Sequence, residues 1–307
     1  MKHYDVTEIK GVIPANLTIF DEKENLDDSR TKEVLDFLLD HDADGFYLTG
    51  STGACFTMTM EERMHTVETV INHVNGRKPV IVHVGDIGTK KSIELAKQAE
   101  KAGADAISSV PPFYWKFSQD DIFSYYRDIS ESVDLPMIVY NIALAGIMDE
   151  GLLQRIAQLD HVKGLKYTAR SHDEMGFLKE KLGKDFMIYS GCDEMALSGF
   201  CFGADGIIGS FYNVIPDIYK KIENSFREGN MPEAIRLQKM ADEFIFACLK
   251  YDFPSVLHNL LRWRGVDGGY IRRPFCNYEE DDLQALKEAI REIRDRLGAK
   301  ELDVFEI

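Results

Sequence analysis

Short apolar runs alternate with longer segments of helical period over the first two thirds of the chain. Eight runs have the composition of strands, at residues 11–17, 45–49, 79–84, 106–110, 136–140, 162–166, 186–190 and 206–210. Helical spacing lies between them, as at Ile93, Ala96 and Ala99, which precede Gly103 at the place of a C-cap glycine. The pattern predicts eight consecutive strand-helix units.

A short phrase recurs where a predicted helix gives way to a strand. It reads Ala43-Asp44-Gly45, Ala104-Asp105-Ala106 and Ala204-Asp205-Gly206, which we interpret as a weak internal repeat. Apolar strands that alternate with helices suit a parallel sheet covered by helices, and eight such units close a barrel. We therefore predict an α/β fold, a (β/α)8 TIM barrel, with a doubly wound open sheet as the alternative.

The chain beyond residue 210 has a purely helical pattern. Near its end, one helical face carries Leu283, Leu286, Ile290, Ile293 and Leu297. The acidic run at 279–282 comes just before this face and is predicted to be a solvated first turn, because carboxylates favour the positive end of the helix dipole. We predict a catalytic barrel over residues 1–226 and a C-terminal helical extension over residues 227–307 that packs on it.

Charge narrows the range of partners. With 36 Lys+Arg against 52 Asp+Glu, the formal net charge of -16 repels nucleic acid and acidic membrane surfaces. An anionic substrate would need a locally positive pocket. Pro14, Asn16 and Thr18 interrupt the apolar residues of the N-terminus, which predicts a first strand rather than a secretory signal. No apolar run approaches the ~20 residues of a spanning helix.

Cysteine and histidine give no sign of a metal site. The five cysteines are odd in number and lack CxxC spacing, so neither a disulfide framework nor zinc is indicated, and we expect a cytoplasmic location. The eight histidines are scattered, without an HExxH pair. Gly203, Gly206 and Gly209 are spaced GxxGxxG, unlike the dinucleotide fingerprint.

Candidate chemistry lies at the ends of the predicted strands, because a parallel barrel builds its active site from strand C-termini and the loops after them. Lys166 ends the sixth run, and alternation places Val162, Gly164 and Lys166 on one face with Lys163 opposite. Tyr140 ends the fifth run, so both side chains can point into one barrel mouth. Taken singly, each has an ordinary alternative: a solvated lysine and a packed core tyrosine.

Two further strand ends carry polar groups. Gly50-Ser51-Thr52-Gly53 offers hydroxyls and amides of the kind that hold a carboxylate or phosphate, although a plain strand-to-helix turn fits as well. Asp193 and Glu194 follow the seventh run. Adjacent carboxylates rarely flank one bond from opposite sides, as glycoside hydrolysis requires, so hydroxyl binding is the better hypothesis. For Asp193, N-capping of the next helix is equally open.

Six motifs occur in order and together carry a resemblance. They are residues 50–53 (GSTG), 112–114 (PFY), 140–142 (YNI), 164–168 (GLKYT), 191–194 (GCDE) and 206–210 (GIIGS). With them, the chain resembles the N-acetylneuraminate lyase family, which belongs with dihydrodipicolinate synthase to a superfamily of pyruvate-dependent class I aldolases. The resemblance runs through the barrel and into the helical tail.

The resemblance implies roles for these residues. Lys166 matches the Schiff-base lysine, Tyr140 the proton-shuttling tyrosine, Ser51 and Thr52 the pair that binds the substrate carboxylate, and Tyr114 a tyrosine inserted near the site of a neighbouring subunit. The positions that contact the sugar tail correspond to Thr168, Gly191, Asp193, Glu194 and Ser210. A homotetramer is implied, and neither metal nor organic cofactor. Because an ammonium cannot attack a carbonyl, we also predict a lowered pKa for Lys166.

The implied reaction is the reversible cleavage of N-acetylneuraminate to N-acetylmannosamine and pyruvate. The synthase branch is expected to place an arginine just after the Tyr140 motif, where this chain has residues 143–146 (ALAG). Three departures leave the exact sugar and its acyl group open: Ala54 in place of glutamate, Cys192 in place of tyrosine, and no proline after Ile142. The alternatives are another pyruvate-dependent aldolase or synthase and a non-catalytic barrel that binds sugar acids.

Overall fold

The structure, a computed structural model, describes residues 2–305 and contains one eight-stranded parallel sheet. Its strands are β1 (Gly11–Pro14), β2 (Phe46–Leu48), β3 (Val80–His83), β4 (Ala106–Ser109), β5 (Met137–Ile142), β6 (Val162–Thr168), β7 (Met187–Ser190) and β8 (Gly206–Gly209). They run in the order β1-β8-β7-β6-β5-β4-β3-β2. The Asn16 N–H donates to the Tyr47 carbonyl and the Asp44 N–H to the Val12 carbonyl, which joins β1 to β2. The predicted barrel is confirmed, and the open-sheet alternative is wrong.

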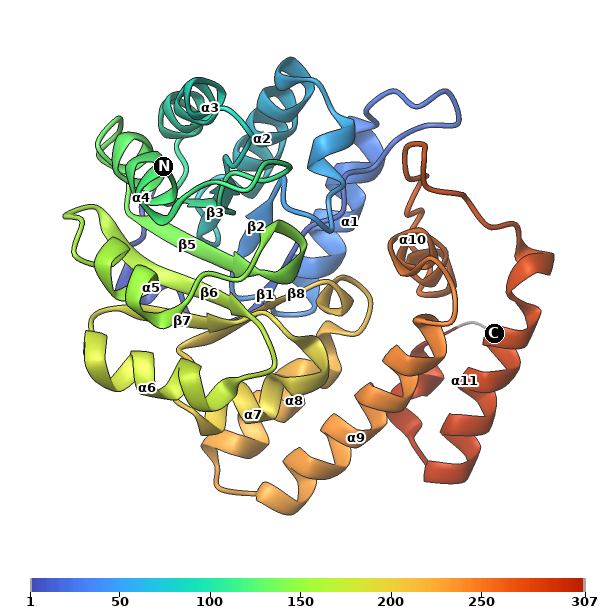
Figure 1. The fold of residues 1–307 in the computed structure, drawn as a ribbon. Helices are drawn as coiled ribbons and strands as arrows, with labels where there is room; N and C mark the ends of the chain where they lie inside the picture. Colours follow the sequence, from blue (N-terminus) through green and yellow to red (C-terminus); the bar gives the residue numbers. More distant parts are fainter. Residues whose placement is uncertain (1, 306–307) are drawn as a thin grey trace.

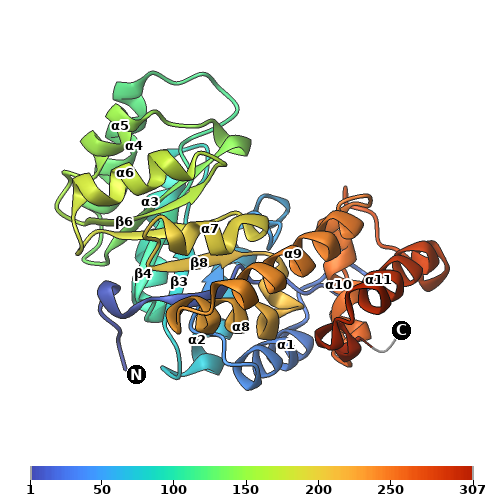
Figure 2. The ribbon, with the colours of Figure 1, turned by 90° about the horizontal axis from the view of Figure 1, so that it is seen from below.

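Helices surround the barrel and extend beyond it on one side (Figure 1). The surrounding helices are α1 (Asp28–Asp40), α2 (Met60–Val74), α3 (Thr89–Ala102), α4 (Gln119–Ser130), α5 (Glu150–Ile156), α6 (His172–Leu182), α7 (Ala196–Cys201) and α8 (Pro216–Arg227). As predicted, α3 ends at Gly103, whose φ is +97°. Three more helices, α9 (Met231–Cys248), α10 (Phe253–Trp263) and α11 (Gln284–Leu297), lie together beyond α8 and α1 in both views (Figures 1 and 2).

Two apolar clusters make the core. The smaller one fills the barrel interior with residues such as Ile13, Ile81, Ile138 and Ile208. The N-terminal turn closes the floor of this cluster, where the Tyr189 hydroxyl donates to the Ile9 carbonyl at 2.9 Å. The interior is therefore packed, and free space for a ligand has to be sought at the barrel's mouth.

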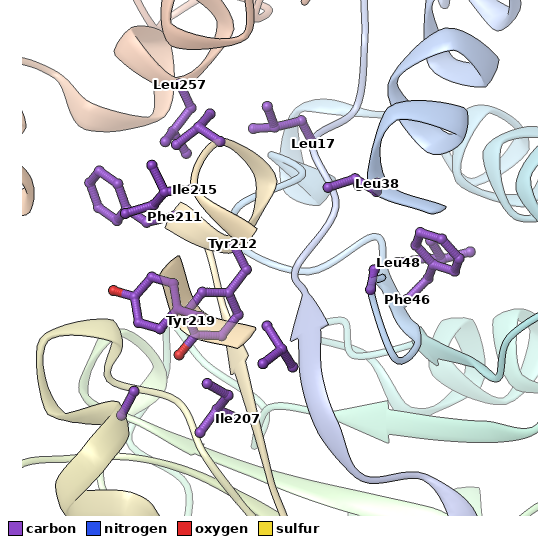
Figure 3. Packing of buried hydrophobic residues seen from close by; sticks show 14 of the residues in the cluster. Leu17, Leu38, Phe46, Leu48, Ile207, Phe211, Tyr212, Ile215, Tyr219 and Leu257 are labelled. Atoms are coloured by element: carbon purple, nitrogen blue, oxygen red, sulfur yellow. The ribbon is translucent and has the colours of Figure 1, made fainter. Parts of the chain in front are cut away.

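The larger cluster lies between the strands and the helices and continues into α9–α11. Figure 3 shows the part where Leu257 of α10 gathers with Phe211, Ile215 and Leu17. Because the core is continuous there, α9–α11 pack against the barrel, while the division into residues 1–226 and 227–307 stays a prediction. No helix among residues 2–305 combines the length and apolar character needed to cross a membrane.

The helical face predicted near the C-terminus is confirmed in α11. Leu286, Ile290 and Ile293 are buried, whereas Leu297 is 38% exposed. The acidic run before it forms a solvated start: Glu279 is the N-cap of a short 3-10 turn, η6 (Glu280–Leu283), and its N–H donates to the Asp282 carboxylate. Acidic groups at this position stabilise the turn that leads into the helix.

The recurring Ala-Asp phrase has a structural role at the barrel floor. Asp44 accepts the N–H of Val12 at 2.8 Å, Asp105 that of Val80 at 2.8 Å and Asp205 that of Ile188 at 2.9 Å. Each carboxylate thus binds the start of a neighbouring strand, where a buried backbone N–H would otherwise lack a partner. The repeat marks barrel assembly rather than ligand binding.

Strand β6 departs from simple alternation. Met137 pairs with Val162 but Ile138 pairs with Gly164, so Lys163 is an extra residue at a bulge. Lys163 is exposed, and Val162 joins the outer cluster. The prediction that Val162 shares a face with Lys166 is therefore wrong. Beyond the bulge, Gly164 faces Ile138 of the barrel interior, and alternation then turns Lys166 inward.

Candidate active site

Lys166 and Tyr140 lie side by side at the barrel mouth. They are register partners on β6 and β5, and each is only 3% exposed. The Lys166 Nζ lies 4.1 Å from the Tyr140 ring centroid and 4.2 Å from that of Tyr47. No carboxylate in the described chain forms an ion pair with this amine. A buried lysine thus sits between aromatic faces without a directly paired anion.

This environment changes the protonation of the lysine. Burial disfavours the ammonium and lowers the pKa of Lys166 to about 7, while the nearby Asp193 charge opposes the shift. The lowered pKa predicted from sequence is confirmed. At neutral pH the free amine, the form that can attack a carbonyl carbon, is therefore far more populated than in an exposed lysine.

Burial raises the pKa of Tyr140, whereas it lowers the pKa of Lys166. The hydroxyls of Thr168 and Ser51 oppose the rise only in part. The resting tyrosine is therefore a neutral phenol. Thr168 ends β6, and its Oγ1 is buried without a hydrogen bond of normal geometry among residues 2–305. A buried hydroxyl without a partner is available to a ligand.

The turn after β2 brings further hydroxyls to the mouth. Thr52 Oγ1 lies 2.6 Å from Ser210 Oγ, which connects this turn to the one after β8. Ser51 is half-buried and lines a mostly apolar cavity of about 380 Å³. This cavity also contains two positions where the chain departs from the family pattern, Ala54 and the segment after Ile142. Its lining comprises Ser51, Ala54, Cys55, Phe56, Thr57, Val110, Phe113, Ile142, Leu144, Ala145, Pro274 and Phe275.

Gly191 and Asp193, in the turn after β7, lie next to Thr168 and Lys166. A β-carbon on Gly191 would lie 1.9 Å from Thr168 Oγ1 and 3.3 Å from Lys166 Cε, so no larger residue fits there without displacement. Asp193 Oδ2 accepts the N–H of Phe211 at 2.7 Å, and burial raises the pKa of Asp193 to about 7. The capping alternative for Asp193 is wrong: the N-cap of the following 3-10 turn is Cys192, without a side-chain hydrogen bond.

Two predicted residues lie apart from this group within one chain. Tyr114 is 82% exposed beside the 68% exposed Trp115, and its backbone φ is +78°. Glu194 is half-buried and lines a different depression of about 390 Å³ between α7 and α9, together with Gln238 and Lys239. Nothing in the chain's own fold brings the Tyr114 ring to Lys166.

Two buried polar residues near the mouth, His83 and Gln238, were not predicted from the sequence. His83 ends β3 and is 1% exposed; its place at a strand end was the signal that could have found it. Gln238 of α9 donates to the Asp193 carbonyl at 3.1 Å and accepts the N–H of Leu197 at 2.9 Å. No local pattern distinguishes this glutamine, because its role depends on the packing of α9 against the turn after β7.

Known proteins with similar sequences support the interpretation of this site. Residues 8–293 match the Dihydrodipicolinate synthetase family. The chain belongs to this family. It is 35% identical to N-acetylneuraminate lyase of Rhizobium meliloti (strain 1021) over 285 residues, which is 92% of this chain and 95% of that protein. The family resemblance found in the sequence is thereby confirmed.

Solved structures of the family share the whole fold. CdNal from Clostridium difficile, solved in complex with mannosamine, is 30% identical with a TM-score of 0.89, covering 93% of this chain and 99% of that one. A catalytic lysine mutant of Ruminococcus gnavus sialic acid aldolase is 29% identical with a TM-score of 0.90, covering 96% and 99%. Both similarities therefore cover the extension as well as the barrel.

Proposed function

We propose that the protein is a carbon–carbon lyase that reversibly cleaves N-acetylneuraminate to N-acetylmannosamine and pyruvate through a Schiff base on Lys166. Relatives named N-acetylneuraminate lyase and sialic acid aldolase support the reaction. The observation that carries the mechanism is the buried amine of Lys166, with its pKa near 7, beside Tyr140. A silent sugar-acid-binding barrel would have no need to keep a lysine neutral at this position.

The first steps use the free amine. Lys166 Nζ attacks the keto carbon of the open-chain sugar acid, water leaves, and an iminium forms that accepts the electron pair of the breaking carbon–carbon bond. Ser51 and Thr52 hold the carboxylate next to this carbon. Their hydroxyls and the turn's amides donate hydrogen bonds and present partial positive charge, which can hold an anion although the overall charge of the protein is negative.

Cleavage needs a base at the hydroxyl beside the breaking bond. Tyr140 takes that proton as its own phenolic proton moves towards Ser51, since burial keeps the resting side chain protonated. N-acetylmannosamine leaves, and the enamine on Lys166 is protonated and hydrolysed to pyruvate. We assign contacts with the sugar hydroxyls to Thr168, Gly191, Asp193 and Ser210. The resemblance assigns Glu194 to the same role, although in the single chain it lines the depression between α7 and α9.

The exposed Tyr114 points to an assembly. We assign it to the site of a neighbouring subunit, because in its own chain the ring is 82% exposed and next to the exposed Trp115. Covering two such aromatic rings stabilises association through the apolar area removed from water. The assembly we propose is a homotetramer, and we keep the cytoplasmic location as part of the proposal.

The test is intact-mass measurement after borohydride reduction in the presence of pyruvate. We expect a pyruvate-sized adduct on the wild type and none on Lys166→Ala. The matched control is Lys163→Ala, which removes the exposed lysine of the same strand and should trap pyruvate like the wild type. No adduct on the wild type would contradict the Schiff-base mechanism. Condensation of pyruvate with N-acetylmannosamine and other aldehydes then identifies the sugar.

A further inference from the structure

His83 is a buried histidine at the mouth for which the proposed mechanism has no use. Both ring nitrogens have fixed roles. Nδ1 lies 2.9 Å from the Thr49 carbonyl, which can only accept, so Nδ1 carries the hydrogen. Nε2 lies 3.3 Å from the backbone N–H of Val110, which can only donate, so Nε2 accepts. The histidine is thus neutral and held in one tautomer.

The contact with Thr49 bears directly on the turn that contains Ser51. Thr49 has a φ of +51°, a left-handed conformation that a β-branched residue rarely adopts. Two hydrogen bonds hold it there: His83 Nδ1 donates to the Thr49 carbonyl, and Thr49 Oγ1 donates to the His83 carbonyl at 2.8 Å. Because Gly50 and Ser51 follow at once, the path of this turn depends on the histidine.

The same ring touches two other parts of the mouth. Val110, bound through Nε2, leads into the segment that carries Tyr114. The ring also meets Tyr140 edge-on, with centroids 6.1 Å apart at 88°, and Phe56 at 6.2 Å and 85°. His83 therefore contacts Thr49 just before the Ser51 turn, Val110 before the Tyr114 segment, and the Tyr140 ring.

The charges around His83 keep it neutral. Arg63 is buried and donates to the His83 carbonyl at 3.0 Å, with Asp86 3.6 Å from its guanidinium. Burial, the Arg63 charge and Lys166 lower the pKa of His83 well below its usual value. The Cys55 thiol, 3.9 Å from Nδ1, stays protonated because burial raises its pKa to about 11. A β-carbon on Gly85 would lie 2.8 Å from Nε2, so a larger residue at position 85 would collide with the ring in this place.

We propose that His83 is a positioning residue that fixes the Ser51 turn for binding of the substrate carboxylate and aligns the Tyr140 ring beside Lys166. This inference rests on the proposed function, since it assigns a part in that reaction to a residue away from the reacting atoms. In this role His83 acts through the hydrogen bonds of one neutral tautomer and transfers no proton.

Two conservative variants separate the two ring nitrogens. His83→Asn keeps an N–H near the place of Nδ1 and loses the acceptor for Val110. His83→Gln keeps an acceptor near the place of Nε2 and loses the donor to Thr49. The pyruvate concentration that gives half-maximal trapping on Lys166 should rise about 10-fold in His83→Gln and stay within about 3-fold of wild type in His83→Asn, as expected for one buried hydrogen bond.

The matched control is His172→Asn. This histidine is also buried, bonds to Ser198 at 2.9 Å behind β7 and lies outside the mouth. His172→Asn should lower the melting temperature without changing the pyruvate concentration that gives half-maximal trapping. If His83→Gln and His83→Asn likewise lose only melting temperature, His83 is merely structural and the inference is overturned.

Crystal structures of the two variants keep this test separate from catalysis. If His83 positions the turn, the Ser51 and Thr52 hydroxyls should be displaced in His83→Gln and should keep their wild-type positions in His83→Asn. A turn that is unchanged in both variants would overturn the inference. Failure of the wild type to trap pyruvate would instead contradict the proposed function. If neither variant folds, Thr49→Gly replaces them, because it removes the Oγ1 donor to the His83 carbonyl and a glycine adopts positive and negative φ about equally, so that the path of the turn is no longer fixed. Looser pyruvate binding in Thr49→Gly supports the inference, and unchanged binding overturns it.

Discussion

The two ends of the barrel use buried polar groups in different ways. At the floor, Asp44 and Asp205 each accept a strand N–H and pair with a lysine, and Asp105 accepts two N–H groups. At the mouth, three buried polar atoms have no hydrogen bond of normal geometry among the described residues: Asn16 Oδ1, Thr168 Oγ1 and Asn213 Oδ1. Because buried polar groups are normally paired, the floor serves stability and the mouth keeps capacity for a ligand.

The largest effect is expected from Lys166→Met at the mouth. Lyase activity should fall to the background rate, because the nucleophile is gone. The free energy of unfolding should rise on the order of 1–3 kcal/mol at pH 6, since a buried charge is replaced by an apolar side chain of similar length. Urea denaturation and a turnover assay check both results. A loss of stability would contradict the assignment of this end to function.

The stabilisation by Lys166→Met should depend on pH. The folded pKa of about 7 lies below the ordinary 10.5, so the folded wild type binds fewer protons between these values. The cost of burying the charge is complete below pH 7 and disappears as the pH rises towards 10.5. The difference in unfolding free energy between variant and wild type should therefore shrink from pH 6 to pH 9, and a constant difference would contradict the lowered pKa.

Tyr140→Phe should reduce kcat about 10²-fold to 10⁴-fold through loss of the proton shuttle. Trapping of pyruvate on Lys166 should persist, because the amine and the Ser51–Thr52 turn proposed to bind the carboxylate remain. Steady-state kinetics and intact mass measure the two effects. The control is Tyr167→Phe, whose hydroxyl bonds Glu174 on the helix side of the same strand pair. Equal losses of kcat in both variants would show that Tyr140 only packs.

Asp205→Asn at the floor should lower stability and leave activity nearly unchanged, the reverse of the effects expected at the mouth. Loss of the charge that binds Lys179 at 2.7 Å should cost about 2 kcal/mol of unfolding free energy while kcat changes less than about 2-fold. Urea denaturation compares it with Asp160→Asn, an exposed carboxylate near the same end. A fall in kcat with stability unchanged would break the division between the two ends.

Thr168→Val is expected to have the smallest effect of these substitutions. It tests directly whether an unpaired polar group at the mouth is kept for the ligand. Removing a buried hydroxyl without a partner should leave stability unchanged or raise it by up to about 1 kcal/mol. The KM for the sugar acid should rise about 10-fold, as expected for a lost hydrogen bond to ligand. If stability falls instead, the hydroxyl is paired within the protein and the mouth is less open than we describe.

Much of this arrangement could be predicted from the sequence, because period and strand order are local signals. All eight strands were located, and the position of Lys166 and Tyr140 at adjacent strand ends foretold that they meet. The bulge at Lys163 could not be predicted, since it depends on pairing with β5. His83 was missed because its importance lies in contacts with two distant backbone groups, Thr49 and Val110.

Tyr114 shows a different limit. Its role was inferred only from resemblance, and the single chain leaves its ring exposed. A residue whose partner belongs to another molecule has no signal in local period or in the intrachain fold.

Gln238 gives the C-terminal helices a meaning for protein engineering. The Asp193 carbonyl is held by Gln238 from α9 and by the Tyr219 hydroxyl from α8 at 3.1 Å each. A barrel transplanted without its last helices would therefore retain Lys166 and Tyr219 but lose Gln238, one of the two groups that hold the turn proposed to bind the sugar. We expect such a chimera to become promiscuous towards aldehydes before it becomes inactive, so the tail is the place to begin when a new acceptor is sought.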